Sequence, residues 1–158
     1  MSNQSSEIEL GNVEADASMD CWDSFIDFAY MQVDQSVKDQ SRAYKLKLAF
    51  EELISNIIRS SSEHSGGHLK QPTLKITALE RESPDHHFFV LRTEDNGIEF
   101  NPRFGERPAV DTEQPVQDRQ IGGLGLFLIQ ESVDEVSYRW ADGKNTYELS
   151  MSTSQNTE

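Results

Sequence analysis

Apolar side chains recur three and four residues apart in a long segment from about Gln40 to Ser61. This spacing follows the 3.6-residue period of an α-helix, so these side chains fall on one helical face. The stripe consists of Leu46, Ala49, Phe50, Leu53 and Ile57. The segment therefore predicts a long amphipathic helix that buries this face against other parts of the chain.

Two shorter signals precede this helix. A second helical period begins at Ser18, a residue type that commonly caps helix N-termini. Its apolar stripe consists of Trp22, Phe25, Ile26, Ala29, Tyr30 and Val33. Further upstream, the segment from Ile8 to Val13 predicts a short edge strand.

The second half of the chain alternates between apolar and polar residues, which is typical of strands. Thr73 to Glu80 and His86 to Glu94 predict two strands around a turn from Arg81 to Asp85, and the second strand carries apolar residues on both faces. A third helix is expected from Gly122 to about Val133. A hairpin follows, with Asp142-Gly143 as its turn. Its apolar residues are Val136, Tyr138, Trp140, Tyr147, Leu149 and Met151. This order predicts a two-layer α/β sandwich with a largely antiparallel or mixed sheet.

Length and composition limit the class of protein. A chain of 158 residues suits one domain over residues 1–158, with an ordered core from about residue 8 to 152 and polar tails at both ends. The single cysteine, Cys21, excludes an intrachain disulfide and a cysteine-rich metal site. No signal-peptide pattern and no run of ~20 apolar residues is present in the sequence. We therefore expect a cytoplasmic protein.

The charge is strongly negative. There are 14 basic and 28 acidic residues, which gives a net charge of −14. This balance excludes a nucleic-acid partner and disfavours an anionic membrane surface. Eight acidic residues precede the first basic residue, Lys38: Glu7, Glu9, Glu14, Asp16, Asp20, Asp23, Asp27 and Asp34. This acidic quarter either keeps the chain solvated or binds a basic partner.

Glu52 and Asn56 are four residues apart on the predicted long helix, so they lie one turn apart beside the apolar stripe. Arg59 joins the same edge one turn later, whereas Glu51 falls on the opposite flank. An amide oxygen can complete a Mg²⁺ site whose other ligands are phosphate and water, and a nearby carboxylate can deprotonate an attacking hydroxyl. The alternative is that both are ordinary border residues of an amphipathic helix.

Asp95-Asn96-Gly97 directly follows a predicted strand. Asn-Gly is a common turn dipeptide, and a simple turn is one interpretation. In the other, the Asp95 carboxylate accepts a hydrogen bond from the exocyclic amino group of adenine. Gly97 then lets the backbone lie close to the ring, and Phe100 closes one side of the pocket.

Gly122-Gly123-Leu124-Gly125-Leu126 places three glycines at a helix start. Such a segment can capture an anion such as a phosphate, or it can be a flexible loop. It matches neither a dinucleotide-binding fingerprint nor a Walker P-loop. The polar segment from Asn101 to Ile121 lacks an apolar period, which is typical of a disordered segment or a functional lid.

In this order, the three motifs resemble the GHKL ATP-binding superfamily, and most of all its anti-sigma-factor serine kinases. The resemblance runs from about Asp20 to Met151, and its most specific segments are Leu48 to Arg59, Glu94 to Pro102 and Ile121 to Ile129. It implies a Bergerat-type fold, in which helices cover one face of the sheet. It also implies ATP and Mg²⁺ as ligands.

The resemblance assigns a role to each motif. Glu52 is similar to the general base, Asn56 to the Mg²⁺ ligand and Asp95 to the residue that holds the adenine amino group, with Gly97 beside the ring. Gly123 and Gly125 are expected to line the phosphates, Thr146 to match a hydroxyl residue near the adenine, and Arg59 to touch a phosphate. The chain departs from the family after Arg59, where Ser60-Ser61-Ser62 replaces a His-Ala-Tyr type segment.

The resemblance implies a serine/threonine protein kinase that phosphorylates a STAS-domain antagonist under a lid from Phe104 to Arg119. A sigma factor is the implied alternative partner, and homodimers are common in the group. Two other hypotheses remain: an ATP-gated binding module without phosphoryl transfer, and a detached histidine-kinase catalytic domain. Glu52 favours the kinase, because binding alone needs no base. No histidine lies between Met1 and Glu63, which disfavours the histidine-kinase hypothesis.

Overall fold

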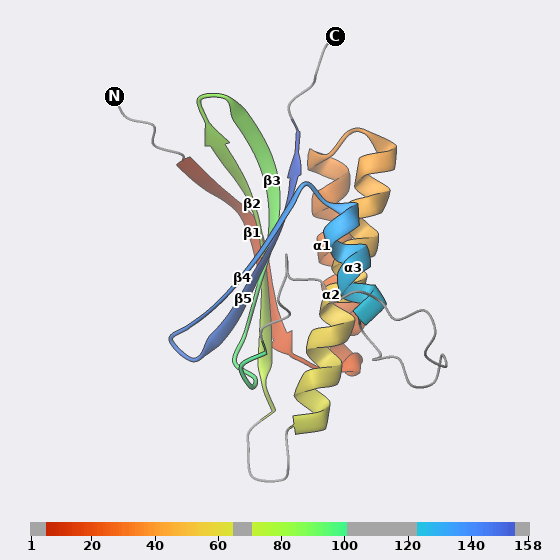
Figure 1. Cartoon of the computed structure of the whole chain (residues 1–158), viewed down its shortest axis with the longest axis vertical. Helices are drawn as coiled ribbons and strands as arrows, with labels where there is room; N and C mark the ends of the chain where they lie inside the picture. Colours follow the sequence, from red (N-terminus) through yellow and green to blue (C-terminus); the bar gives the residue numbers. More distant parts are fainter. Residues whose placement is uncertain (1–5, 65–70, 101–122, 154–158) are drawn as a thin grey trace.

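The computed structural model describes residues 6–64, 71–100 and 123–153. The strands are β1 (Ser6–Asp16), β2 (Thr73–Ser83), β3 (His86–Asp95), β4 (Glu135–Ala141) and β5 (Lys144–Ser152). The helices are the 3₁₀ turn η1 (Met19–Cys21), α1 (Trp22–Ser36), α2 (Gln40–His64) and α3 (Gly123–Ser132). The three α-helices lie on one side of the sheet (Figure 1). The α/β sandwich expected from the sequence is therefore confirmed.

The strands form one sheet in the order β1-β2-β3-β5-β4, and every neighbouring pair is antiparallel. Strand β5 lies between β3 and β4, because α3 carries the chain across before the final hairpin turns back. In that hairpin Asp142 and Gly143 both have positive φ, 55° and 74°, as expected for a type I′ turn.

The core lies between α2 and the helix-facing side of the sheet. The predicted α2 stripe is buried along its whole length, from Leu46 to Ile57. Phe25, Ala29 and Val33 of α1 are also buried, whereas Trp22 and Ile26 pack at its margin. The strands supply the other half of the core with Leu74, Ile76, Ala78, Phe89, Leu91, Tyr147 and Leu149. The helical and strand periods therefore identified the core-forming faces.

Two local predictions differ in detail from the structure. The turn expected from Arg81 to Asp85 contains only Pro84 and Asp85, because the two strands pair as far as Ser83 and His86. Ser18 is the N-cap residue of η1, as expected, but its side chain makes no capping hydrogen bond, and its hydroxyl lies 4.0 Å from the Cys21 sulfur.

Strand β1 is an edge strand and is longer than the predicted Ile8–Val13. Its register with β2 shifts between Glu9 and Gly11, which leaves Leu10 as an extra residue in a bulge. A Cβ atom at Gly11 would lie 3.1 Å from the Gln32 amide nitrogen and 3.3 Å from the Phe28 ring. Glycine at this position therefore lets α1 pack closely on β1.

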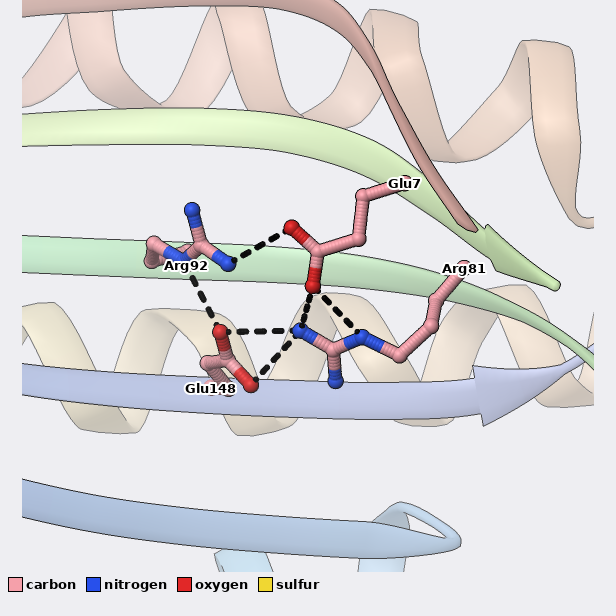
Figure 2. Close-up of polar contacts among 4 residues, drawn as sticks. All are labelled: Glu7, Arg81, Arg92 and Glu148. Atoms are coloured by element: carbon pink, nitrogen blue, oxygen red, sulfur yellow. Dashed lines mark hydrogen bonds and ion pairs between the residues drawn. The ribbon is translucent and has the colours of Figure 1, made fainter. Parts of the chain in front are cut away.

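Four charged residues form a network on the sheet face opposite the helices (Figure 2). Arg81 lies 2.6 Å from Glu7 and 3.1 Å from Glu148, and Arg92 lies 3.2 Å from Glu7 and 2.8 Å from Glu148. Each arginine thus bridges two carboxylates, and the network joins β1, β2, β3 and β5. Hydrogen bonds, first of all from Arg81, lower the pKa of Glu7 below its ordinary value.

We predict that Glu7→Gln lowers the free energy of unfolding at neutral pH by at most about 1 kcal/mol, because this ion pair is solvent-screened. The pKa of Glu7 is lowered in the folded state. The Glu7 charge therefore contributes to the free energy of unfolding above the ordinary glutamate pKa, and this contribution is lost as the pH falls through the lowered pKa. Urea unfolding between pH 2 and 7 measures this difference.

Glu14→Gln is the matched control, because Glu14 lies on the same strand and the structure records no ion pair for it. A pH-independent difference between wild type and Glu7→Gln would contradict the role of Glu7 in the network.

Candidate functional site

The turn after β3 holds a buried carboxylate. Asp95 is only 4% exposed, and its Oδ1 accepts hydrogen bonds from the Gly97 backbone N–H and from Asn145 Nδ2, each at 3.0 Å. The structure gives Oδ2 no hydrogen bond from the described residues. Asp95 therefore presents one oxygen that is fixed by the protein and one that can accept a hydrogen bond from a ligand.

Gly97 brings this turn against the C-terminal half of α2. A Cβ atom at this position would lie 3.1 Å from Asp95 Oδ1 and 3.4 Å from the hydroxyl of Ser61, which is buried. The side chain of Asn96 accepts a hydrogen bond from the Thr73 backbone N–H at 2.8 Å. The segment after Asp95 is thus a turn, and the carboxylate that it buries keeps one oxygen without a hydrogen bond from the described residues, whereas recognition of adenine stays a prediction.

Asn145, the second residue of β5, was missed by the sequence interpretation. It is the register partner of Asp95 and is 2% exposed. Thr146 was expected at this place, but side chains alternate along a strand, so Thr146 lies on the opposite face with Glu148. The expected role of Thr146 near the adenine stays a prediction.

The backbone of Phe100 is tied to β5. Its N–H donates to Asn145 Oδ1 at 2.9 Å, and its carbonyl accepts from the Tyr147 hydroxyl at 2.8 Å. The side chain of Phe100 is 42% exposed. Its proposed role in closing the pocket remains a prediction.

The two adjacent glutamates of α2 have different surroundings, as expected from their positions on the helix. Glu51 accepts a hydrogen bond from the Tyr30 hydroxyl of α1. Glu52 is half-buried, and the structure records neither a hydrogen bond nor an ion pair from the described residues to its carboxylate. Glu52 is thus the carboxylate that remains available for chemistry.

Asn56, one turn after Glu52, is half-buried and contacts Arg59. Its Oδ1 accepts a hydrogen bond from Arg59 Nη1 at 3.0 Å, whereas its buried Nδ2 has no partner among the described residues. The same part of the chain also supplies no partner for the buried hydroxyl of Thr93, two residues before Asp95. Leaving a buried polar atom unpaired costs ~1–3 kcal/mol, and such atoms are typical of sites that bind ligands or water.

The glycine-rich segment does open a helix. Helix α3 begins at Gly123 and packs against α2 (Figure 1), so the first-turn backbone of Gly123, Leu124, Gly125 and Leu126 is helical. The first N–H groups of a helix have no intrahelical acceptor, which makes this end suited to an anion. Gly122 and the predicted lid from Phe104 to Arg119 lie outside the described residues.

Burial controls the ionisation of the groups around Asp95. Desolvation raises the pKa of the Asp95 carboxyl, although hydrogen bonds from Asn145 and Gly97 oppose this effect. Desolvation, followed by the charge of Asp95, also raises the pKa of Tyr147. The Tyr147 phenol therefore remains a proton donor to the Phe100 carbonyl at neutral pH.

A separate concavity of about 710 Å³ lies at the opposite end of β3 and β5. Its lining includes Val37, Arg42, Phe88 and Asp134, and none of the predicted site residues. Arg42 and Asp134 pair with each other at 2.6 Å across it. This concavity is therefore distinct from the candidate site.

The family comparison agrees with this arrangement. The family model for the histidine kinase-like ATPase domain matches residues 28–152, which is more than half of the chain, and the chain belongs to this family. The chain is thus an ATP-binding domain of the GHKL type. No curated protein matches it. Within the described residues, no helix combines the length and apolar character needed to cross a bilayer.

We predict that Asp95→Asn raises the free energy of unfolding at neutral pH. The raised pKa means that the folded state disfavours the charged Asp95 carboxylate, so the wild type loses stability as the pH rises from the ordinary aspartate pKa to the raised one. The gain in free energy of unfolding of Asp95→Asn over the wild type should reach its maximum above the raised pKa and should vanish at acid pH.

Urea unfolding between pH 3 and 8 tests this expectation, with Asp27→Asn as an exposed control. A less stable Asp95→Asn variant at neutral pH would show that the carboxylate charge stabilises the fold.

Proposed function

We propose that this protein is an ATP-dependent serine/threonine protein kinase of the anti-sigma-factor type. The observation that carries the proposal is the contrast between the two glutamates of α2: Glu51 accepts a hydrogen bond from Tyr30, whereas the Glu52 carboxylate has no partner among the described residues and lies one turn from Asn56. A domain that only binds nucleotide needs no such carboxylate.

Oδ2 of Asp95, which accepts no hydrogen bond from the described residues, supports recognition of adenine. The exocyclic amino group of adenine is a donor and matches a carboxylate oxygen, whereas guanine presents a carbonyl at the same position. The place of Gly97 beside the ring is part of this proposal; in the structure, its lack of a side chain lets the turn pack against Asp95 Oδ1 and the Ser61 hydroxyl. The N-terminus of α3 is suited to the phosphates.

Asn56 fits a Mg²⁺ ion that accompanies the nucleotide. Its amide oxygen is a hard neutral ligand, and phosphate oxygens and water would supply the other ligands. Bound Mg²⁺ would neutralise charge on the transferring phosphoryl group. Arg59 holds the Asn56 oxygen in this structure, so the guanidinium must move before a metal can bind there. The displaced Arg59 would then be free to contact a phosphate.

Glu52 acts as the general base in this proposal. The partner's serine oxygen forms a bond to the γ-phosphorus while the bond from that phosphorus to the bridging oxygen of ADP breaks. The serine proton passes to the Glu52 carboxylate, and ADP leaves with the electron pair of the broken bond. Positioning and charge neutralisation supply most of the rate enhancement.

The proposed substrate is a STAS-domain antagonist protein, and a sigma factor is the alternative partner. These partners rest on the resemblance of Leu48 to Arg59 and of Ile121 to Ile129 to anti-sigma-factor kinases. Incubation with radiolabelled ATP and candidate STAS proteins, followed by mapping of the labelled residue, tests this proposal. Label on a partner histidine, or on no protein, would contradict it.

We predict that Glu52→Gln keeps the affinity for Mg-ATP within about threefold but slows phosphoryl transfer by roughly 10²–10⁴-fold, the usual contribution of a general base. Calorimetry measures the affinity, and the radiolabel assay measures the transfer. Glu51→Gln is the matched control, because it makes the same change at the adjacent glutamate, which accepts a hydrogen bond from Tyr30, and leaves Glu52 in place. Wild-type transfer by Glu52→Gln would favour the ATP-gated binding module.

We also predict that Asn56→Ala abolishes the Mg²⁺-dependent part of nucleotide binding, because it removes the proposed metal ligand. The protein is titrated with ADP in a calorimeter, once in the presence of Mg²⁺ and once in the presence of EDTA. The difference between the two affinities is the Mg²⁺-dependent part of binding. Ser55→Ala, at the preceding half-buried position, serves as the control. Equal Mg²⁺ dependence in wild type and Asn56→Ala would remove the metal role of Asn56.

A further inference from the structure

Asn145 uses its entire side-chain amide for contacts within the protein. Nδ2 donates to Asp95 Oδ1 at 3.0 Å and to the Ile98 carbonyl at 2.9 Å. Oδ1 accepts from the Phe100 N–H at 2.9 Å and from the Tyr138 hydroxyl at 2.7 Å. An amide has two donor hydrogens and two acceptor lone pairs, so no position is left for a ligand.

Three of these bonds connect the segment from Asp95 to Phe100 with Asn145 at the start of β5, and the fourth comes from Tyr138 of β4. The segment leaves the sheet after Asp95, and Asn145 holds it at three points: a side chain, a carbonyl and an N–H. Because Asn145 is almost fully buried, these bonds are shielded from water and geometrically restrictive. The conformation of the segment is therefore set before any ligand binds.

Asn145 also determines which oxygen of Asp95 faces a ligand. Oδ1 already accepts two hydrogen bonds, from Asn145 and from the Gly97 N–H, whereas Oδ2 accepts none from the described residues. Without Asn145, the carboxylate would keep only the Gly97 contact and could rotate about its χ2 angle. A rotating carboxylate discriminates poorly between a donor and an acceptor on the base.

We propose that Asn145 is the positioning residue that sets base selectivity, by fixing Asp95 so that Oδ2 accepts a hydrogen bond only from a base with an amino group at the position where adenine carries it. This inference rests on the proposed recognition of adenine by Asp95, but it does not depend on phosphoryl transfer. Asn145 acts through Asp95 and does not touch the base.

The test compares ATP with ITP, because inosine carries a carbonyl where adenosine carries the amino group. Calorimetry with the full chain gives the ratio of the two affinities. The wild type should prefer ATP by roughly ten- to a hundredfold, the range of one hydrogen bond to a charged group. Asn145→Ala should reduce this ratio to within about threefold of unity, and Asn145→Ser should recover part of it by donating a hydrogen bond to Asp95.

Ser150→Ala is the matched control, because it alters a buried residue of β5 on the face opposite Asn145 and should retain the wild-type ratio. If Asn145→Ala does not fold, as judged by circular dichroism, Tyr138→Phe replaces it. That variant removes one bond to Asn145 and should lower the ratio in the same direction.

A folded Asn145→Ala variant with the wild-type ratio would overturn the inference, as would an unchanged ratio in Tyr138→Phe when that variant replaces it. A weaker affinity for both nucleotides with an unchanged ratio would also overturn it, because a merely structural role predicts that result. A wild type that binds neither nucleotide would instead overturn the proposed function, and with it this inference.

Discussion

The antiparallel register of β3 and β5 determines the geometry of the candidate site. It pairs Asp95 with Asn145, so the last residue of one strand meets the second residue of another across the sheet. The two residues are fifty positions apart along the chain. Both side chains lie on the face of the sheet that is covered by the helices. The close approach of the turn to α2 at Gly97 then follows, because Asn145 holds the backbone of Ile98 and Phe100.

The groups of the candidate site lower the stability of the folded state. A desolvated carboxylate, and an amide nitrogen on Asn56 and a hydroxyl on Thr93 that find no partner among the described residues, all disfavour the folded state. The apolar face of α2 continues past Glu52 and Asn56, with side chains buried from Leu46 to Ile57. The same helix therefore stabilises the fold with one face and carries the candidate reactive groups beside it.

The sequence predicted features that depend on local periodicity, such as the buried face of α2, the hairpin at Asp142-Gly143 and the different surroundings of Glu51 and Glu52. It did not predict features set by contacts between distant segments. Whether Asn145 or Thr146 faces Asp95 depends on the register of β5 against β3. Both residues are polar, so the alternation of apolar and polar residues along β5 does not show which of them faces the helices. Arg81 was assigned to a turn because its partners, Glu7 and Glu148, are 74 and 67 residues away.

The bulge in β1 has a consequence for the behaviour of the protein at high concentration. The outer edge of a strand of eleven residues, such as β1, can offer a row of N–H and C=O groups to any other extended chain. Here Leu10 interrupts that row, and Glu9 and Glu14 add negative charge on either side of the interruption. Two copies brought edge to edge would face mismatched spacing and mutual repulsion, so this margin of the sheet resists fibre-like self-association.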